Sequence, residues 1–474
     1  MLPRGGKFMT REFDLVVIGV GMASVNAARK CASAGWSVAV IDELPYGGTC
    51  ALRGCDPKKM LRRGAEIIDG AARMEGNGVT PSGLKIDWPE LVAFKNSFTA
   101  KMPDRIETGL ESQGITTFHG RARFCAEDAL ELEDGSVIRG GKILIASGAK
   151  PRSLDFEGAG HLVDSTAFME LYTLPDRIVF VGGGFVSFES AHIAARAGSE
   201  TLIIDHGDRP LKAFDPDLVD RLVQRGRKAG VGFQSQTEIC SVEASGRDFR
   251  VTLSKDGHEE TVSANLVVHG AGRVPMLDAL DLEKGGVEWT ESGVSVTEHL
   301  QSVSNPGVYA AGDAADTAGA PLTPVAVIEG KVAASNMLKG NQTKPDYHGV
   351  PSAVFTIPEL ARVGLSEKKA QARGNARTEF NDTSGWYSNL RVGETCAAAK
   401  VIIDDDTDEI LGAHLLGPGY SELINIFALA MQTGLKSADL KRLTSAYPSV
   451  GSDLGSMLIA PKPHKSRRSL KTVD

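Results

Sequence analysis

Two copies of one local pattern constrain the fold of this chain most strongly. Each copy is an apolar run that enters a glycine-rich turn, followed by a helix-forming stretch and a second apolar run that ends in aspartate. The copies span residues 13–42 and 177–205. Strand, helix and strand in this order form a βαβ unit, which places the two strands in parallel in one sheet. Two such units predict an α/β fold with two Rossmann-like dinucleotide-binding domains.

The first glycine turn has the spacing of a dinucleotide site. It reads Gly19-Val20-Gly21-Met22-Ala23-Ser24. In such a turn the first glycine permits a tight bend and the second lets a pyrophosphate approach the helix N-terminus, while the third position needs a small residue, here Ser24. Asp42 ends the second strand, where a carboxylate can accept a hydrogen bond from an adenosine ribose.

The second glycine turn reads Gly182-Gly183-Gly184-Phe185-Val186-Ser187. Glu189 follows shortly after it, and Asp205 stands at the acidic position. A carboxylate there accepts from a ribose 2′-OH and repels a 2′-phosphate, which favours NADH. His206, Arg209 and Lys212 come next and could hold a 2′-phosphate instead. NADH is therefore preferred, with NADPH as the alternative.

A pair of cysteines follows the first βαβ unit. In the segment 47–59, GGTCALRGCDPKK, four residues separate Cys50 from Cys55, and helix-forming sequence comes next. If the helix begins at Cys55, its N–H groups and dipole favour a thiolate there. The two sulfurs could form a small disulfide ring that accepts two electrons. The alternatives are a structural disulfide or two unrelated thiols.

The length, net charge and apolar content of the chain limit the classes of protein to which it can belong. The chain has 474 residues, enough for about three domains. Its net charge of −8 excludes a general nucleic-acid footprint. It has no apolar run long enough to cross a membrane and no apolar signal-peptide core near its start, so we expect a cytoplasmic protein without membrane contact. The other cysteines are expected to be buried as small hydrophobic residues: Cys31, Cys125, Cys240 and Cys396.

Taken together, these motifs resemble those of the class I pyridine nucleotide–disulfide oxidoreductases, such as glutathione reductase, dihydrolipoamide dehydrogenase and mercuric reductase. The resemblance covers nearly the whole chain. It extends to the links at 145–151 and 272–275, to Ala311-Gly312-Asp313, and to the segment 322–326 near the flavin ring. It implies a discontinuous FAD domain (10–152 and 275–345), an NAD(P) domain (153–274), and an α+β dimerisation domain (346–465) of a homodimer, with tails at 1–9 and 466–474.

The resemblance also implies roles. Electrons pass from NAD(P)H through FAD to a Cys50–Cys55 disulfide, with Cys55 as the flavin-side thiolate and Cys50 as the thiol that attacks a disulfide substrate. Lys58 lies near the flavin N5 and pairs with Glu189. The residues implied for FAD are Gly19, Gly21, Ser24, Asp42, Gly48, Thr49, Lys59, Ser147, Gly148, Gly312 and Asp313. Those implied for NAD(P) are Gly182, Gly184, Ser187, Asp205, His206, Gly272 and Arg273.

One segment near the C-terminus departs from the family pattern. The disulfide reductases carry a His-Pro…Glu segment whose histidine moves protons across the dimer interface. Here Tyr447 stands at the histidine position and Ser452 at the glutamate position, with Asp453 one residue later. An unperturbed tyrosine has a pKa near 10, so Tyr447 is a poor base at neutral pH, although it can donate a hydrogen bond. Asp453 could act through water.

Three functional hypotheses follow. The first is reduction of a disulfide or a related electrophile. The second is a metal-ion reductase of the mercuric type, or a quinone reductase, that uses Tyr447. Against mercury, the last cysteine is Cys396, so the C-terminal cysteine pair of mercuric reductases is missing. The third is an FAD-binding redox sensor or accessory subunit with little turnover. No histidine is spaced with cysteine as in a zinc site, so no resident metal is expected.

Overall fold

The computed structural model describes residues 10–459, which form two compact units. Unit 1 contains the chain up to Ile68, Gly83–Pro210 and Ala229–Tyr347. Unit 2 contains Asp69–Ser82, Leu211–Lys228 and the chain from His348. The predicted tails, 1–9 and 466–474, lie outside the described residues. The boundary predicted between FAD and NAD(P) domains falls inside unit 1 and stays a prediction.

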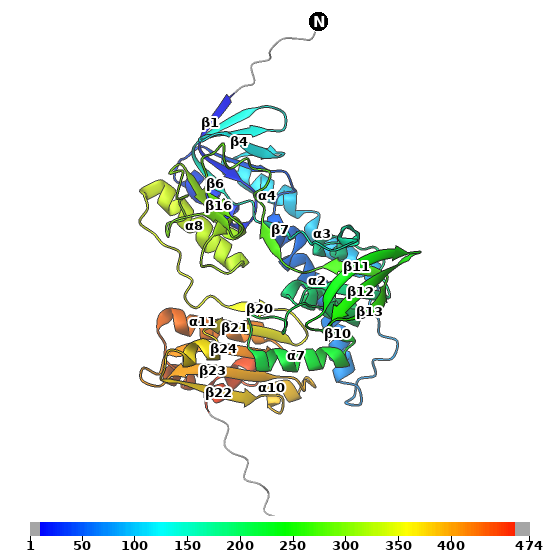
Figure 1. The fold of residues 1–474 in the computed structure, drawn as a ribbon. Coiled ribbons are helices and arrows are strands. Elements are labelled where there is room, and N and C mark those ends of the chain that lie inside the picture. Colours follow the sequence, from blue (N-terminus) through cyan, green and yellow to red (C-terminus); the bar gives the residue numbers. More distant parts are fainter. Residues whose placement is uncertain (1–9, 460–474) are drawn as a thin grey trace, which may run out of the picture. The chain divides into compact units, whose positions relative to one another are not determined.

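The first sheet of unit 1 has seven strands in the order β3-β2-β1-β6-β5-β4, with β18 also paired to β6 (Figure 1). Its strands are β1 (Thr10–Ile18), β2 (Val38–Asp42), β3 (Thr116–His119), β4 (Ala122–Ala126), β5 (Ala129–Leu132), β6 (Val137–Ile145) and β18 (Val308–Ala310). β1, β2, β3, β6 and β18 run parallel. Ile18, Ile145 and Ala310 are in register, so the segments that follow them emerge at one edge of the sheet.

The apolar run of β1 is continuous because both faces of this sheet are covered. Leu15 and Val17 belong to one buried cluster with α1 (Met22–Ser33) and α8 (Thr323–Lys339). Val16 and Ile18 belong to a second cluster on the other face. Alternate residues of a strand point to opposite faces, so a strand buried on both sides has no polar positions. This explains why residues 15–18 read as a buried parallel strand in the sequence.

The second parallel sheet of unit 1 has the order β10-β9-β8-β14. Its strands are β8 (Arg177–Val181), β9 (Glu200–Ile204), β10 (Val231–Gln234) and β14 (Leu266–His269). α6 (Phe185–Arg196) connects β8 to β9, as the second βαβ unit predicts. An antiparallel sheet of β11 (Glu238–Ser245), β12 (Asp248–Lys255) and β13 (His258–Ala264) adjoins it in sequence. The two predicted links pair with each other as β7 (Ala149–Pro151) and β15 (Arg273–Pro275).

Further elements complete unit 1. They are the helices α3 (Trp88–Thr99), α4 (Met102–Glu111) and α5 (Ser165–Met169), and the small sheet of β16 (Trp289–Thr290), β17 (Gly293–Ser295) and β19 (Ala315–Asp316). The break between α3 and α4 falls at residues 100–101, close to the interruption that Pro103 predicts. α2 (Cys55–Arg73) begins in unit 1 and ends in unit 2.

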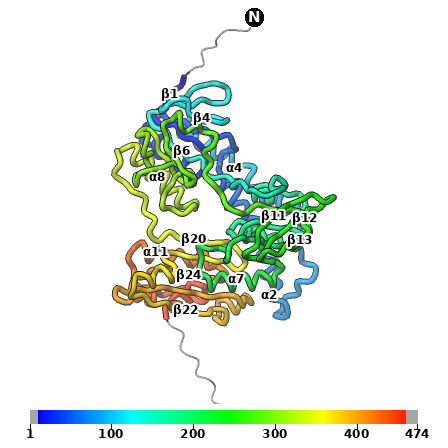
Figure 2. The backbone as a smooth tube through the Cα atoms, in the orientation of Figure 1, coloured from blue at the N-terminus to red at the C-terminus, as the bar shows by residue number. Residues whose placement is uncertain are grey.

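Unit 2 is built on a five-stranded antiparallel sheet in the order β20-β21-β24-β23-β22. The strands are β20 (Ser352–Val354), β21 (Glu359–Gly364), β22 (Ala376–Asp382), β23 (Ala398–Asp404) and β24 (Ile410–Gly417). The helices are α7 (Pro216–Lys228), α9 (Glu367–Gln371), α10 (Tyr387–Leu390), α11 (Tyr420–Thr433), α12 (Ser437–Lys441) and α13 (Leu454–Met457). α7 packs against β24 although it lies far from it in the sequence (Figure 2). This sheet with helices confirms the predicted α+β character.

Two of the four expected buried cysteines are exposed. Cys31 and Cys396 are buried as predicted, but Cys125 and Cys240 are not. Cys125 occupies an exposed position of β4, whose side chains alternate between buried and exposed. Cys240 lies at the irregularity of β11 between Ile239 and Ser241. Among the residues that the structure describes, no helix is long and apolar enough to cross a membrane. The cytoplasmic location stays a prediction.

Candidate active site

The first glycine turn packs so tightly that side chains would not fit. Gly19 has φ +90°, and a Cβ atom there would lie 2.5 Å from the carbonyl oxygen of Ala146. A Cβ atom at Gly48 would lie 2.8 Å from the Cα of Gly21. The glycine turn after β1 and the turn before Cys50 therefore touch through bare backbone. Such a surface lets a phosphate approach backbone N–H groups closely.

Polar groups around this turn fit a dinucleotide. The Oγ atoms of Ser24 and Ser147 are buried and have no hydrogen-bond partner among the described residues, so a bound polar ligand would satisfy them. The carboxylate of Asp42 accepts from the backbone N–H of Val20 at 2.7 Å and of Leu44 at 2.9 Å. Burial raises the pKa of Asp42, and these bonds oppose the shift. A carboxylate has about four acceptor positions, so two remain for a ribose.

The remaining predicted FAD segments meet at the same place. Gly312 begins a turn that carries Asp313, and a Cβ atom at Gly312 would lie 3.6 Å from the Cβ of Ala23 in α1. Arg273 donates to the hydroxyl of Thr49 at 3.4 Å and to the carbonyl oxygen of Ala149. Burial raises the pKa of Asp313, while the charge of Arg273 opposes the shift. The structure thus brings together predicted FAD residues from four separate stretches of sequence.

The helix α2 begins at Cys55, as the sequence predicts. Cys50 lies in the preceding π-helical turn, Thr49–Arg53, and the two sulfurs are present as separate thiols. A hydrogen bond from the Cys50 thiol lowers the pKa of Cys55 to about 6; Lys59 and Lys58 also lower it, and burial opposes them. The same hydrogen bond and burial raise the pKa of Cys50. These opposite shifts favour the thiolate at Cys55 and the proton at Cys50.

A buried ion pair accompanies the thiols. The ammonium of Lys58 lies 2.7 Å from the Oε2 of Glu189, and the side chains are 6% and 3% exposed. Lys59 lies 3.3 Å from the same oxygen. The ammonium of Lys58 also lies 5.2 Å from the ring centre of Phe185. Glu189 stands in α6, one turn after the second glycine motif. The pairing that the resemblance implied is therefore present.

The second glycine turn has the geometry expected for a nicotinamide dinucleotide. A Cβ atom at Gly182 would lie 2.6 Å from the Cα of Ala271, and one at Gly183 would lie 2.6 Å from the Oδ2 of Asp205. Asp205 thus lies directly over the turn. The imidazole of His206 is 3.7 Å from Asp205 and 80% exposed. Gly184 precedes the first residue of α6, and the hydroxyl of Ser187 donates to the carbonyl oxygen of Val181 at 3.5 Å. Arg273, which was also predicted for NAD(P), contacts Thr49 instead.

In unit 2, Tyr447 and Asp453 have partners that sequence reasoning missed. The ring of Tyr447 is 79% exposed and stacks on that of Tyr387, with centres 6.4 Å apart. The carboxylate of Asp453 accepts a hydrogen bond from the hydroxyl of Ser388, and burial raises the pKa of Asp453. Both partners lie in the short helix α10. No motif marks them, because α10 lies about 60 residues upstream of Tyr447.

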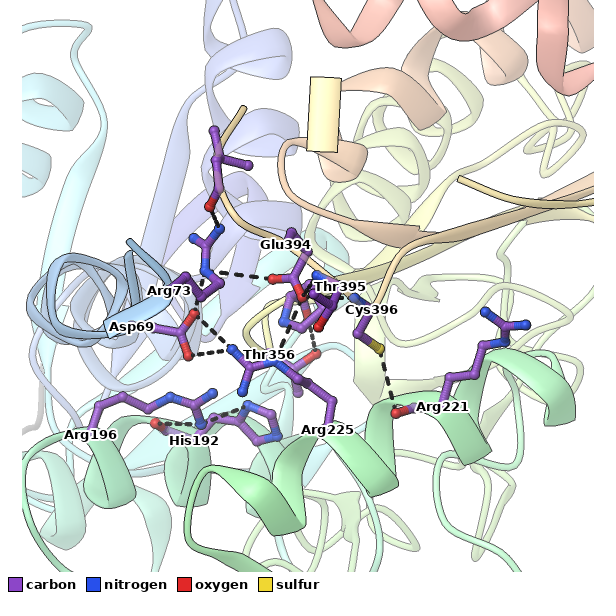
Figure 3. Close-up of polar contacts among 12 residues, drawn as sticks. Asp69, Arg73, His192, Arg196, Arg221, Arg225, Thr356, Glu394, Thr395 and Cys396 are labelled. Atoms are coloured by element: carbon purple, nitrogen blue, oxygen red, sulfur yellow. Dashed lines mark hydrogen bonds and ion pairs between the residues drawn. The ribbon is translucent and has the colours of Figure 1, made fainter. Parts of the chain in front are cut away.

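Unit 2 also holds a buried ion cluster that the sequence did not predict (Figure 3). Asp69 receives hydrogen bonds from Arg73 at 2.9 Å and from Arg225 at 3.1 Å. Glu394, whose side chain is fully buried, lies 3.6 Å from Arg225 and 3.7 Å from Arg73. Asp69 and Arg73 belong to the last turn of α2. The cluster therefore fixes the end of the helix that begins at Cys55.

Comparisons with known proteins identify the family to which this chain belongs. Residues 13–330 match the family model described as pyridine nucleotide-disulphide oxidoreductase, and residues 350–457 match the dimerisation domain of that family. The chain belongs to this family. A glutathione reductase of Burkholderia cepacia is 29% identical over 93% of this chain and 97% of its own length. A dihydrolipoyl dehydrogenase of Chlamydia muridarum is 30% identical over 93% of this chain and 95% of its own length.

A solved structure agrees with these relatives. It is the Cu(II) complex of the HOCl-induced flavoprotein disulfide reductase RclA from Escherichia coli, with a TM-score of 0.85, 25% identity, and coverage of 94% of this chain and 99% of that one. The predicted fold class and the predicted enzyme class are confirmed. The protein is an FAD-dependent pyridine nucleotide–disulfide oxidoreductase with a dimerisation domain.

Proposed function

We propose that this enzyme uses NADH to reduce a small disulfide, or a disulfide carried on a thiol compound, and works as a homodimer. The observation that carries the proposal is the Cys50–Cys55 pair, because Cys55 begins α2, Cys50 lies in the turn before it, and a hydrogen bond from Cys50 lowers the pKa of Cys55. Bound FAD would supply the chemistry that connects the two substrates, namely hydride acceptance from the nicotinamide and two-electron reduction of the Cys50–Cys55 disulfide.

The cysteines then act by thiol–disulfide exchange. The Cys50 sulfur attacks one sulfur of the substrate disulfide, so a mixed disulfide forms and one substrate thiol leaves. Cys55 next attacks the Cys50 sulfur, which releases the second substrate thiol and restores the Cys50–Cys55 disulfide. Two electrons leave the enzyme and two protons are needed to yield two thiols. Lys58 supplies a positive charge beside the thiolate, and Glu189 balances that charge inside the protein.

The FAD residues proposed are those predicted from the sequence. The bare-backbone contact of Gly21 with Gly48 and the buried hydroxyls of Ser24 and Ser147 support this assignment. We propose that Asp42 accepts from the adenosine ribose and that Asp313 accepts from the ribityl chain.

NADH is the proposed nicotinamide cofactor because Asp205 lies over the second glycine turn. A carboxylate at that place accepts from a free ribose 2′-OH and repels a 2′-phosphate. The exposed His206 beside it is the group that would favour NADPH instead.

We propose that Tyr447 donates a hydrogen bond to the substrate. Its exposure in unit 2 and its place in the dimerisation domain support a role at the surface that a second copy of the chain covers. In the homodimer, the family resemblance puts this segment beside the cysteines of the partner subunit.

Anaerobic turnover with separate acceptors tests the proposal. The purified flavoprotein is given NADH or NADPH together with glutathione disulfide, lipoamide or a panel of other disulfides. We expect faster oxidation of NADH, and we expect Cys50→Ser to abolish disulfide turnover while flavin reduction persists. Cys125→Ser, which changes an exposed cysteine far from the motif in sequence, is the matched control. Turnover by the Cys50→Ser protein would show that the pair is not the relay.

A metal-ion reductase is the second candidate. It is favoured by the similar structure, which is a Cu(II) complex, and by Tyr447 at the histidine position. Cu(II), Hg(II) and a quinone are therefore tested in the same assay. Loss of metal-dependent turnover in Tyr447→Phe, with disulfide turnover retained, would put this function first. Flavin reduction without turnover of any acceptor would favour the redox sensor.

A further inference from the structure

A buried carboxylate lies behind the turn that carries Asp313. Glu329 stands in the middle of α8 and is 1% exposed. Its Oε2 accepts from the backbone N–H of Gly312 at 2.6 Å. Its Oε1 accepts from the hydroxyls of Thr317 at 2.8 Å and Tyr347 at 2.6 Å. Three donors thus converge on one buried carboxylate.

This arrangement compensates a charge that is costly to bury. Burial raises the pKa of Glu329, the neighbouring charge of Asp313 raises it further, and the three hydrogen bonds lower it. Hydrogen bonds to an ionised acceptor are roughly twice as strong as neutral ones. The carboxylate is therefore anchored by donors from three different segments, and each segment is fixed in turn by the carboxylate.

Gly312 is the backbone donor among the three, so its N–H cannot rotate to another acceptor as a hydroxyl can. Its φ of +69° is a left-handed conformation, and a Cβ atom there would lie 3.4 Å from the Cβ of Ala326 in α8. Gly312 is partly exposed and lies between α8 and α1, and its N–H has a partner inside the protein. Glu329 provides that partner, so the conformation of the turn depends on the carboxylate.

We propose that Glu329 is a positioning residue for FAD: by binding the N–H of Gly312, it holds the turn that presents Asp313 to the flavin cofactor. The inference rests on the proposed role of Asp313. It adds a residue whose hydrogen bonds go to Gly312, Thr317 and Tyr347, so that it would act on FAD through the turn. Thr317 and Tyr347 are its supports, since they orient the carboxylate from the other side.

The same helix reaches the redox pair. α8 begins at Thr323, whose hydroxyl oxygen lies 3.8 Å from the Sγ of Cys55. If Glu329 acts only on the Gly312 turn, its replacement changes flavin binding and leaves the reactivity of Cys55 unchanged. Alkylation of Cys55 in the apoprotein therefore reports whether α8 has kept its place.

The test compares Glu329→Ala, Glu329→Gln and Asp313→Ala as folded apoproteins, with Lys331→Ala, at an exposed position of α8, as the control. FAD is titrated in, and its Kd is measured by fluorescence quenching together with its visible spectrum. Loss of a hydrogen bond to a charged group predicts a Kd about tenfold or more weaker for Glu329→Ala, with an altered spectrum. Glu329→Gln should restore the Kd to within about threefold, because the amide oxygen can face Gly312 while the hydroxyls accept from its NH₂ group.

The outcomes distinguish the proposed role of Glu329 from the proposed role of Asp313. A wild-type Kd in Glu329→Ala, together with a weakened Asp313→Ala, would overturn the role of Glu329 alone. A wild-type Kd in Asp313→Ala would refute the proposed role of Asp313. Glu329→Gln as weak as Glu329→Ala would overturn the inference too, because charge rather than the Gly312 bond would then be responsible. If Glu329→Ala does not fold, Glu329→Asp, which is one methylene too short to reach Gly312, carries the same expectation.

Discussion

The hydrogen bond between the two thiols predicts how the Cys55 thiolate responds to substitution of Cys50. This bond is the largest of the causes that lower the pKa of Cys55 from 9.0 to about 6. A hydrogen bond to a charged group contributes about 1.5–3 kcal/mol. Since one pKa unit corresponds to about 1.4 kcal/mol, removal of the donor should raise the pKa of Cys55 by about one to two units. Cys50→Ala removes the donor, whereas Cys50→Ser keeps a hydroxyl that can donate.

The assay is the pH dependence of alkylation of Cys55 by iodoacetamide, followed by peptide mass spectrometry. The thiolate is the reactive form, so reactivity falls as the pH drops through the pKa of Cys55. The exposed Cys125 and Cys240 in the same digest serve as internal references. In the FAD-loaded variants, the long-wavelength absorbance of the thiolate–flavin contact should titrate with the same midpoint. A midpoint that stays at about 6 in Cys50→Ala would refute the reasoning, because the lysines alone would then account for the low pKa.

Two further predictions concern packing and buried charge. Gly48→Ala should lower the flavin content of the purified protein, because its Cβ would lie 2.8 Å from the Cα of Gly21. The control Gly35→Ala also has a positive φ, +90°, but no atom lies within 4 Å of its Cβ, so it should retain flavin. Equal loss of flavin in both variants would contradict the steric argument. Lys400→Met should destabilise the protein by about 3–5 kcal/mol in urea unfolding, because Lys400 and Asp215 are 2% and 1% exposed and lie 2.8 Å apart. A deficit no larger than the roughly 0–1 kcal/mol of an exposed ion pair would contradict the reasoning.

The parallel sheets could be predicted because their strands are buried on both faces. Residues 15–18 and 177–181 read as strands in the sequence for that reason. In the structure both strands end directly before the glycine turn, β1 at Ile18 and β8 at Val181. The start of α2 at Cys55 could also be predicted, since a glycine-rich turn precedes helix-forming sequence there. In these cases the signal lies within a few neighbouring residues.

Contacts between residues that are far apart in the chain leave no local pattern in the sequence, so they could not be predicted. The donors to Glu329 come from residues 12 to 18 positions away on either side, and the Asp453–Ser388 bond joins residues 65 positions apart. A buried glutamate inside a helix looks like an exposed one until its partners are known. The exposed Cys125 shows the converse error, because burial on a strand with one exposed face depends on which side of the pleat a residue occupies.

The departure of Tyr447 and Asp453 from the family pattern bears on which disulfides the proposed reaction favours. Asp453 already accepts from Ser388, and Tyr447 is an exposed phenol stacked on Tyr387. The thiols, however, share one proton across their own hydrogen bond, so transfer of that proton from Cys50 to Cys55 generates the attacking thiolate without an external base. What then remains is protonation of the departing thiol. A substrate whose thiol has a low pKa leaves as a thiolate and needs no donor. Among disulfides of similar size, turnover should therefore rise as the pKa of the leaving thiol falls, and it should do so more steeply in Tyr447→Phe if Tyr447 donates to the leaving sulfur.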